Sequence, residues 1–447
     1  MKVFITGATG FIGTHVARLL VRQGHRLVCL VRKTSHIQEL EKLDVDLYRG
    51  DIRDRKSLLS GMSGCDALIH LAGVSSFWEP DKKLYTEVNV NGTRNVMECA
   101  LDTGISRVIH ISPLYVYGKP LRIRFDEKST VGPRRFSELA RSKYEAELIS
   151  WGLHRKKNLP LTVCYPAVAI GPGRRRNAVS QVEMLMGHAF LSRSSLNSAQ
   201  TYVHVQDIAE AISRVLTIEG AVGRRYFIAH ERISTRRMQS MVNEIIGSGP
   251  FRIVLPDSLV MFAAGAVAVL ARVLKKPRLQ WMSPEYILTL QNGLMADGTR
   301  SQRELGMSYK PISDAVREEI DSIRTAWSIH EKRKSRRYPL HLDVTYKAKG
   351  TPAESTGSVI DISENGLLLA TAEPCAKGRY ISINLSGGRK EEYVMVRGRV
   401  VRKGKGSMAI DITHKDREIR EMLAGPGMAR EGKPGAEPGI LSLEGSL

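Results

Sequence analysis

The stretch 2-KVFITGATGFIG-13 decides the fold of the first part of this chain. Residues 2–6 read as a buried strand, and the glycine loop 6-TGATGFIG-13 follows it directly and opens a helix. Gly7 permits the tight turn, Gly10 lets a pyrophosphate approach backbone N–H groups, and Gly13 lets the helix pack closely on the sheet. The pattern predicts a dinucleotide-binding loop, and a bare structural turn is the weaker alternative.

The end of the second predicted strand, 26–31, indicates which dinucleotide is preferred. Arg32 and Lys33 follow this strand, where an acidic residue would bond the ribose 2′-hydroxyl of NAD. Basic side chains suit a 2′-phosphate, so NADP(H) is favoured over NAD(H), with two solvated cations as the alternative. The residues predicted to contact the cofactor in these two segments are Gly7, Gly10, Phe11, Ile12, Gly13 and Arg32.

Short apolar runs alternate with segments of helical period over the first third of the chain. This βα alternation predicts an α/β fold, a doubly wound parallel sheet with right-handed crossovers. Between about 137 and 328 the pattern becomes more helical, with a further strand at 160–166. The runs read as buried parallel strands are 2–6, 26–31, 45–50, 66–73 and 107–112, and 86–104 is typical of the helices between them.

The pattern of apolar and polar residues changes after a charged, helix-breaking stretch, 329-IHEKRKSRRYP-339. Six runs then alternate like antiparallel strands with glycine turns, which predicts a small all-β barrel or sandwich. The runs are 340–346, 356–363, 366–372, 379–385, 393–402 and 407–412. We therefore expect a first domain over 1–328, a basic linker over 329–339, a second domain over 340–424 and a disordered tail over 425–447.

Composition limits the partners and the compartment. The formal net charge of +21 in 447 residues favours anionic partners such as nucleotides, nucleic acid or an acidic membrane surface. Five scattered cysteines without CxxC spacing exclude a disulfide framework, give no metal site and fit a cytoplasmic location. The apolar run 259–274 is shorter than the roughly 20 residues that span a bilayer, so a buried or interfacial helix is expected and peripheral membrane contact is the weaker alternative.

Seven motifs together resemble the extended short-chain dehydrogenase/reductase family, in its epimerase/dehydratase branch. They are TGATGFIG, 51-DIRD-54, 70-HLAG-73, 88-VNVNGTRNV-96, 116-VYG-118, 142-SK-143 and 202-YVHVQDIAEAI-212. The resemblance covers residues 1 to about 328 and implies a Rossmann domain with a helical C-terminal lobe closing over a substrate cleft. It also implies that Asp51 and Ile52 lie near the adenine, that Ala72 lies near the ribose or phosphates, and that the protein forms a homodimer.

The same family uses a Tyr-x-x-x-Lys pair and a nearby Ser or Thr to move a proton to or from the substrate oxygen. Aligned on these motifs, Lys143 is present, but Leu139 stands at the tyrosine position and Pro113 at the hydroxyl position. The resemblance leaves Lys143 as a ribose clamp, while loss of a general acid removes roughly 10²–10⁴-fold of rate. Rescue by one of the neighbouring tyrosines is the weaker alternative; these are Tyr115, Tyr117 and Tyr144.

Two short motifs flank the start of the all-β segment. The stretch 333-RKSRR-337 can grip phosphate and guanine through guanidinium groups, and 361-DISENG-366 places a carboxylate and a hydroxyl at a strand end. Together, from 331 to about 424, they resemble the PilZ domain, a bacterial receptor for cyclic di-GMP. The resemblance implies ligand contacts from Arg333, Arg337, Asp361, Ser363 and Gly366.

These observations support three hypotheses. The favoured one is a cyclic di-GMP receptor whose PilZ domain regulates an NAD(P)-binding domain that has lost its usual catalytic tyrosine and serine. The second is a cyclic di-GMP-gated epimerase, dehydratase or reductase that uses a substitute acid. The third, a redox-sensing regulator associated with nucleic acid, ranks last because the sequence shows no recognition helix or interleaved aromatic and basic residues.

Overall fold

The computed structural model divides the chain into two compact units, Met1–Ala326 and Trp327–Leu447, which are treated separately below. It describes residues 1–77, 79, 81–118, 124–130, 137–173, 180–186, 190–247, 253–273, 283–330, 338–363, 366–386, 393–404 and 406–412. Arg333, Arg337 and the predicted tail from 425 onward lie outside the described residues.

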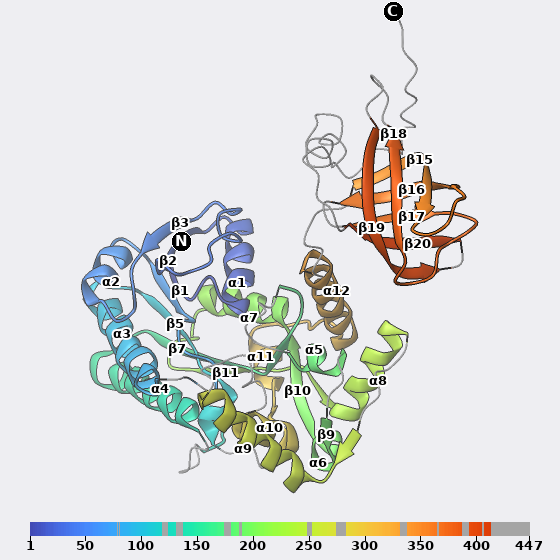
Figure 1. The fold of residues 1–447 in the computed structure, drawn as a ribbon. Helices are drawn as coiled ribbons and strands as arrows, with labels where there is room; N and C mark the ends of the chain where they lie inside the picture. Colours follow the sequence, from blue (N-terminus) through green and yellow to red (C-terminus); the bar gives the residue numbers. More distant parts are fainter. Residues whose placement is uncertain are drawn as a thin grey trace, which may run out of the picture. The chain divides into compact units, whose positions relative to one another are not determined.

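A seven-stranded parallel sheet forms the centre of the first unit (Figure 1). The chain crosses from β1 to one side for β2 and β3 and to the other side for β4, so the strand order reverses between β1 and β4. Ligands of doubly wound sheets bind at such a reversal, beyond the carboxyl ends of the strands. In spatial order the strands are β11 (Arg225–Ile228), β7 (Leu161–Pro166), β5 (Arg107–Ile111), β4 (Ala67–His70), β1 (Lys2–Thr6), β2 (Arg26–Val31) and β3 (Asp46–Arg49).

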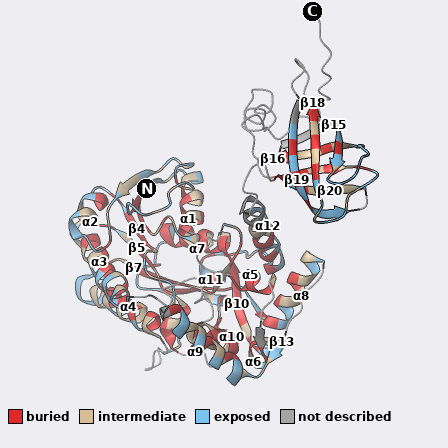
Figure 2. Cartoon of the chain, viewed as in Figure 1, coloured by how far each residue is buried: buried red, intermediate tan, exposed pale blue. Residues whose placement is uncertain are grey.

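Helices cover both faces of this sheet, which explains why its central strands are apolar without alternation. Figure 1 shows α1 and α7 on one face and α2, α3 and α4 on the other, and Figure 2 shows buried residues along the strands between them. All four residues of β4 are buried, and so are the last four of β1. The covering helices are α1 (Phe11–Arg22), α2 (Arg55–Met62), α3 (Gly92–Asp102), α4 (Glu138–Lys157) and α7 (Val205–Thr217).

The rest of the first unit is a mainly helical lobe with its own core. A three-stranded sheet of β12 (Glu231–Ser234), β10 (Ala199–His204) and β8 (Val168–Ile170) runs through it. Apolar side chains from these strands and the surrounding helices form a second buried cluster. The helices of this lobe are α5 (Gln181–Met186), α6 (Arg193–Asn197), α8 (Thr235–Ile246), α9 (Asp257–Val273), α10 (Pro284–Asn292), α11 (Thr299–Glu304) and α12 (Ile312–His330).

The second unit is a closed six-stranded antiparallel barrel. Its inward side chains form a separate apolar core that includes Val359, Ile383 and Ile410, each at most 1% exposed. Pairing of the first strand with the fourth in the chain closes the barrel and leaves no free edge. In spatial order the strands are β15 (Tyr338–Ala348), β16 (Ser355–Ser363), β17 (Gly366–Ala370), β20 (Ser407–Ile412), β19 (Tyr393–Gly404) and β18 (Tyr380–Ser386).

The predicted fold class is confirmed, and the predicted strands agree with the observed ones to within a few residues at each end. One element differs in kind. The segment 86–104 was expected to be a single α-helix, but it begins as a π-helical turn over Tyr85–Asn91 and becomes α-helical only at α3. Among the described residues, no helix combines the length and the hydropathy that crossing a membrane requires.

Candidate functional site

Gly7 lies where the loop after β1 passes against the chain that leaves β4. Its φ is +76°, and a Cβ built on it would lie 2.7 Å from the amide nitrogen of Ala72. Side chains other than hydrogen are disfavoured in this left-handed region. Conformation and space therefore both require glycine here.

Gly13 is required for a different reason, the close approach of α1 to the same loop. A Cβ on Gly13 would lie only 2.2 Å from the carbonyl oxygen of Gly7. Gly10 is the N-cap residue of α1, its N–H donates to the Gly7 carbonyl at 2.9 Å, and it supplies no side-chain cap. Phe11 and Ile12 form the first helical turn, so the positive end of the α1 dipole faces a loop that carries little side-chain bulk. This arrangement can receive a phosphate group.

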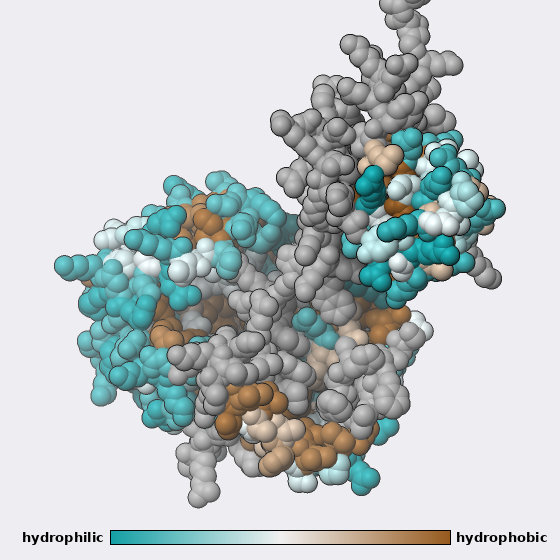
Figure 3. Space-filling view, in the orientation of Figure 1, coloured by the Kyte–Doolittle hydropathy of each residue, from teal (hydrophilic) through white to brown (hydrophobic). Residues whose placement is uncertain are grey.

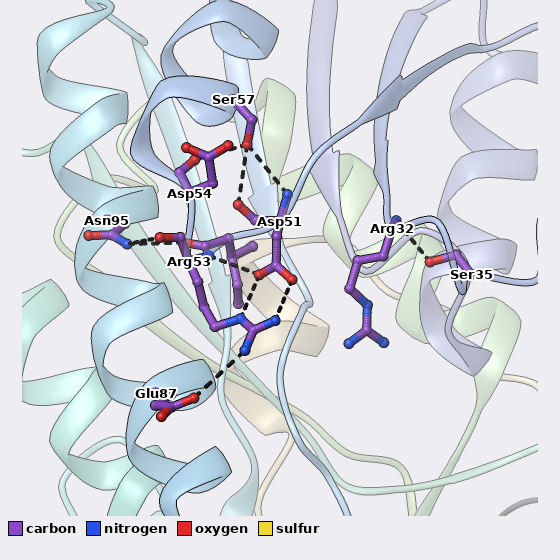
Figure 4. A network of polar contacts seen from close by, with 9 residues as sticks. Arg32, Ser35, Asp51, Arg53, Asp54, Ser57, Glu87 and Asn95 are labelled. Carbon is purple, nitrogen blue, oxygen red and sulfur yellow. Dashed lines mark hydrogen bonds and ion pairs between the residues drawn. The ribbon is translucent and has the colours of Figure 1, made fainter.

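The carboxyl ends of β2 and β3 bring charged groups to the same edge of the sheet (Figure 4). Arg53 donates from Nε and Nη2 to the Asp51 carboxylate, at 3.1 and 2.9 Å, and lies 3.7 Å from Glu87. Burial raises the pKa of Asp51, but the hydrogen bonds from Arg53 outweigh it, so the pKa lies below the ordinary value. Asp51, predicted to lie near the adenine, is thus held by Arg53, a contact that sequence analysis missed.

Arg32 is exposed at the end of β2 and anchors its turn through its backbone, whose N–H donates to Ser35 Oγ at 3.0 Å. Figure 4 shows its side chain across from the Asp51–Arg53 pair. In the described part of the chain its guanidinium has no ion-pair partner, whereas that of Arg53 has two. A free guanidinium can bind an added phosphate without first breaking an existing ion pair.

The other predicted cofactor contacts lie on the β1 and β4 sides of this edge. Ile52 is buried, and a Cβ on Gly92 would lie 2.7 Å from its Cδ1, so the start of α3 packs closely on Ile52. The Ala72 N–H donates to Thr6 Oγ1 at 3.3 Å, and that hydroxyl lies 2.7 Å from His70 Nδ1. Burial lowers the pKa of His70 well below its ordinary value, so the ring is neutral.

Lys143 reaches from α4 to the loop that follows β4. Its Nζ lies 2.1 Å from the point where a Cβ of Gly73 would stand, so it fills the space left by that glycine. Burial lowers the pKa of Lys143 to about 8. The structure thus brings Lys143 to the loop that begins with Ala72, on the β4 side of the sheet reversal.

Asn89, on the π-helical turn, ties this loop to α4. Its Oδ1 accepts from the Val74 N–H at 2.8 Å, and its Nδ2 donates to Ser142 Oγ at 2.9 Å. A π-turn changes the side-chain register of a helix and is frequent at functional sites. Sequence analysis missed Asn89, although its motif, 88-VNVNGTRNV-96, had been quoted as part of the resemblance.

Leu139 and Pro113 are the residues that the sequence alignment places at the family's acid and hydroxyl positions. Leu139 is fully buried, one turn before Lys143 on α4, and has no proton to exchange. Pro113 precedes the short helix 114–117, and the adjacent Ser112 donates its hydroxyl to Glu147 Oε2 at 2.7 Å. The hydroxyl of Ser112, the serine next to Pro113 in the chain, is therefore hydrogen-bonded to a buried carboxylate.

Glu147 is the centre of a buried polar group that sequence analysis did not anticipate. Besides the Ser112 hydroxyl, it accepts from the Tyr165 hydroxyl at 2.5 Å and from Trp151 Nε1 at 3.3 Å. Burial raises the pKa of Glu147 despite these donors and the nearby Arg225 charge. Tyr165 therefore has a buried hydrogen-bond partner in Glu147.

The three tyrosines considered as substitute acids differ in their surroundings. Tyr117 is buried in an aromatic cluster, 5.3 Å between ring centroids from both Tyr165 and Phe227, and burial raises its pKa to about 12. Tyr144 packs against the core of the sheet domain. The Tyr115 ring is tilted against that of Phe77, with 5.5 Å between the centroids, and burial raises the pKa of Tyr115 as well. High phenol pKa values make Tyr115 and Tyr117 poor proton donors at neutral pH.

In the barrel, Asp361 lies beside a bulge. The pairing of β16 with β17 shifts between Val359 and Asp361, so Ile360 is an extra residue that re-aims the side chains after it. Asp361 is opposite Pro339 on β15, which comes two residues after Arg337 in the chain. Because of this register, β15 begins next to the end of β16 that carries Asp361.

The other predicted ligand residues of the barrel are Ser363 and Gly366. Ser363 ends β16, and its side chain lies outside the described residues. Gly366 opens β17, where a Cβ would lie 2.8 Å from the Ile410 carbonyl oxygen. Glycine is therefore required here for the close approach of β17 to β20, in addition to the turn that was predicted. Over the described ranges, no group of three or more His, Cys, Asp or Glu side chains could hold a metal ion.

Comparison with known proteins agrees with this geometry. The model of the NAD dependent epimerase/dehydratase family matches residues 3–229, and that of the PilZ domain matches residues 331–425. Sterol demethylase protein B of Methylococcus capsulatus is 28% identical over 315 residues, which are 69% of this chain and 93% of that protein. A putative dihydroflavonol 4-reductase of Synechocystis is 27% identical, over 71% of this chain and 93% of that protein.

Among solved structures, the dTDP-glucose 4,6-dehydratase DesIV of Streptomyces venezuelae, crystallised with NAD and TYD, has the same fold with a TM-score of 0.60. It is 22% identical and covers 74% of this chain and 98% of its own. The glycine loop, the strand order and the matched family model lead to one conclusion: the chain belongs to the NAD dependent epimerase/dehydratase family and carries a PilZ domain after it.

Proposed function

We propose that this chain is a cyclic di-GMP receptor whose PilZ domain regulates a dinucleotide-binding domain lacking the family's usual proton donor. The observation that carries the proposal is the β15–β16 register, which sets Pro339 opposite Asp361. A basic segment that directly precedes β15 in the chain, together with the Asp361 carboxylate, can bind both the phosphates and the guanine edges of the messenger. Arg333, Arg337, Asp361, Ser363 and Gly366 are its proposed ligand residues.

The first unit, proposed to extend to about residue 328, binds NAD or NADP. The family description names NAD, and the related dehydratase DesIV holds NAD in its crystal structure. The glycines at 7, 10 and 13 leave the approach to the α1 N-terminus open. We propose NADP(H) as the preferred form, because Arg32 offers a guanidinium without an ion-pair partner among the described residues.

Lys143 holds the cofactor ribose in this proposal, and Leu139 leaves it without the phenol that usually works with it. Binding without efficient turnover follows, since both the acid and the hydroxyl positions carry side chains without protons to exchange. One observation favours the second candidate, a gated reductase with a substitute acid. An ammonium with a pKa of about 8 gives up its proton more readily than an ordinary lysine.

Arg337→Ala should weaken the binding of cyclic di-GMP. A bidentate guanidinium contact to guanine is worth about 1–3 kcal/mol, so we expect a roughly 5- to 150-fold loss of affinity. Calorimetric titration of the full-length chain measures it. Arg303→Ala removes the same charge from an exposed position of the first unit and should leave the affinity unchanged. Equal affinities in wild type and Arg337→Ala would contradict the proposed site.

Arg32→Ala should weaken the binding of NADPH and leave the binding of NADH unchanged. A hydrogen bond to a charged group contributes about 1.5–3 kcal/mol, which corresponds to roughly 10- to 100-fold in the dissociation constant for NADPH. Titration by cofactor fluorescence with both nucleotides measures the ratio. Lys56→Ala, which removes another exposed cation near this edge, is the control. An equal loss of affinity for both nucleotides would refute a specific contact to the 2′-phosphate.

Lys143→Met should stabilise the unliganded first unit at pH 7. Lys143 has a pKa of about 8 in the folded chain, below the roughly 10.4 of an unfolded lysine. Between these values only the unfolded chain keeps the proton, so the stability of wild type rises with pH over that window. The gain in stability of Lys143→Met over wild type is therefore largest below pH 8, and it decreases as the pH rises toward 10.4.

Urea unfolding at pH 7 and pH 10, followed by tryptophan fluorescence, tests this prediction. Three of the four tryptophans lie in the first unit and the fourth, Trp327, is the first residue of the second unit, so the signal reports mainly on the first unit. Lys56→Met is the matched control, because it removes an exposed lysine. A variant that is less stable than wild type at pH 7 would show that the burial of Lys143 is not unfavourable.

A further inference from the structure

Helix α9 exposes a continuous apolar stripe. Its solvent-facing side chains are Leu259, Phe262, Val269 and Leu270, and Phe262 is 75% exposed. With Ala266 they follow the spacing of one helical face, and Figure 3 shows hydrophobic side chains gathered over this part of the first unit. Soluble domains seldom leave so large a contiguous apolar surface open to water unless something binds it.

The opposite face of α9 is already committed to the core of the lobe. Val260, Ala264 and Ala271 are each at most 2% exposed, and Val260 and Ala264 belong to the second buried cluster. Asp257, at the start of the helix, accepts from the Ser194 N–H at 3.1 Å and from its hydroxyl, which fixes this end to α6. The helix cannot turn its exposed stripe inward without emptying that core. The exposed side chains of the stripe therefore contribute nothing to the core of the lobe.

Charge distinguishes between the occupants that could cover the stripe. From Ser258 to Ser283 the chain contains four basic residues and no acidic one. Arg193, exposed beside the Ser194 that holds Asp257, adds a further cation near the start of the helix. A second copy of the chain, itself of net charge +21, would bring like charges together at this face. A partner with a negatively charged surface and an apolar interior matches the α9 stripe better than a second copy of the chain does.

We propose that the α9 stripe docks on the surface of a bilayer that contains anionic lipids. The exposed side chains enter the boundary between headgroups and acyl chains, while the buried face of the helix stays on the protein. Arg193 and the basic residues that lie within and directly after α9 in the sequence strengthen the attraction to acidic headgroups and make it sensitive to salt. This inference does not depend on cyclic di-GMP or on the cofactor.

Co-sedimentation of the full-length chain with vesicles tests the proposal. We expect binding to vesicles of phosphatidylcholine mixed with phosphatidylglycerol, and weaker binding to phosphatidylcholine alone or in high salt. Phe262→Ser should lower the partition coefficient at least about tenfold, because burial of a phenylalanine side chain contributes that much or more. Leu148→Ser, at a position 46% exposed on α4, is the matched control and should change nothing.

Three results would overturn the proposal. One is the absence of sedimentation with either vesicle, and another is binding that Phe262→Ser leaves intact. The third is a dimer in analytical ultracentrifugation that Phe262→Ser converts to monomer without any vesicle binding, which would assign the stripe to a second copy. Both variants change exposed side chains, so circular dichroism and the thermal midpoint should match wild type.

Discussion

The contact between Gly13 and the Gly7 carbonyl determines what the first unit can bind. Because a Cβ at residue 13 would lie 2.2 Å from that oxygen, α1 can begin where it does only with glycine there. This seating directs the helix N-terminus at a loop of small residues, at the point where the strand order reverses between β1 and β4. Arg32, Asp51 and Lys143 are informative only because they lie on that same edge of the sheet.

Around this edge lie the residues proposed to bind the cofactor, together with the two positions proposed to have lost their reactive groups. Lys143 stays in place through close packing against Gly73, and Asn89 connects the same loop to α4. Leu139 makes the neighbouring turn of α4 part of the apolar core. Burial of the lysine disfavours its charged form, a cost that chains accept where a cation serves a ligand. These features fit a domain kept for its response to a dinucleotide.

The fold was predictable because its signals are local. Apolar runs bounded by turns predict the parallel strands, and the spacing of Gly7, Gly10 and Gly13 predicts the loop. The Glu147 group was not predictable from the sequence, because Ser112 and Glu147 are 35 residues apart and meet only after the sheet and α4 have packed. The π-turn at Asn89, the Arg53 contact to Asp51 and the bulge before Asp361 likewise depend on tertiary packing. A helical period cannot distinguish a π-turn from an α-helix.

Two nucleotide ligands are proposed for one chain, and α12 ends at His330, only eight residues before β15 begins at Tyr338. In the proposed function the two ligands influence each other's binding, and such coupling must be reciprocal. The most direct measurement is the affinity for NADPH with and without saturating cyclic di-GMP. The account predicts a change of roughly fivefold or more, matched by an equal change in cyclic di-GMP affinity when NADPH is present. Identical NADPH affinities under the two conditions would contradict it.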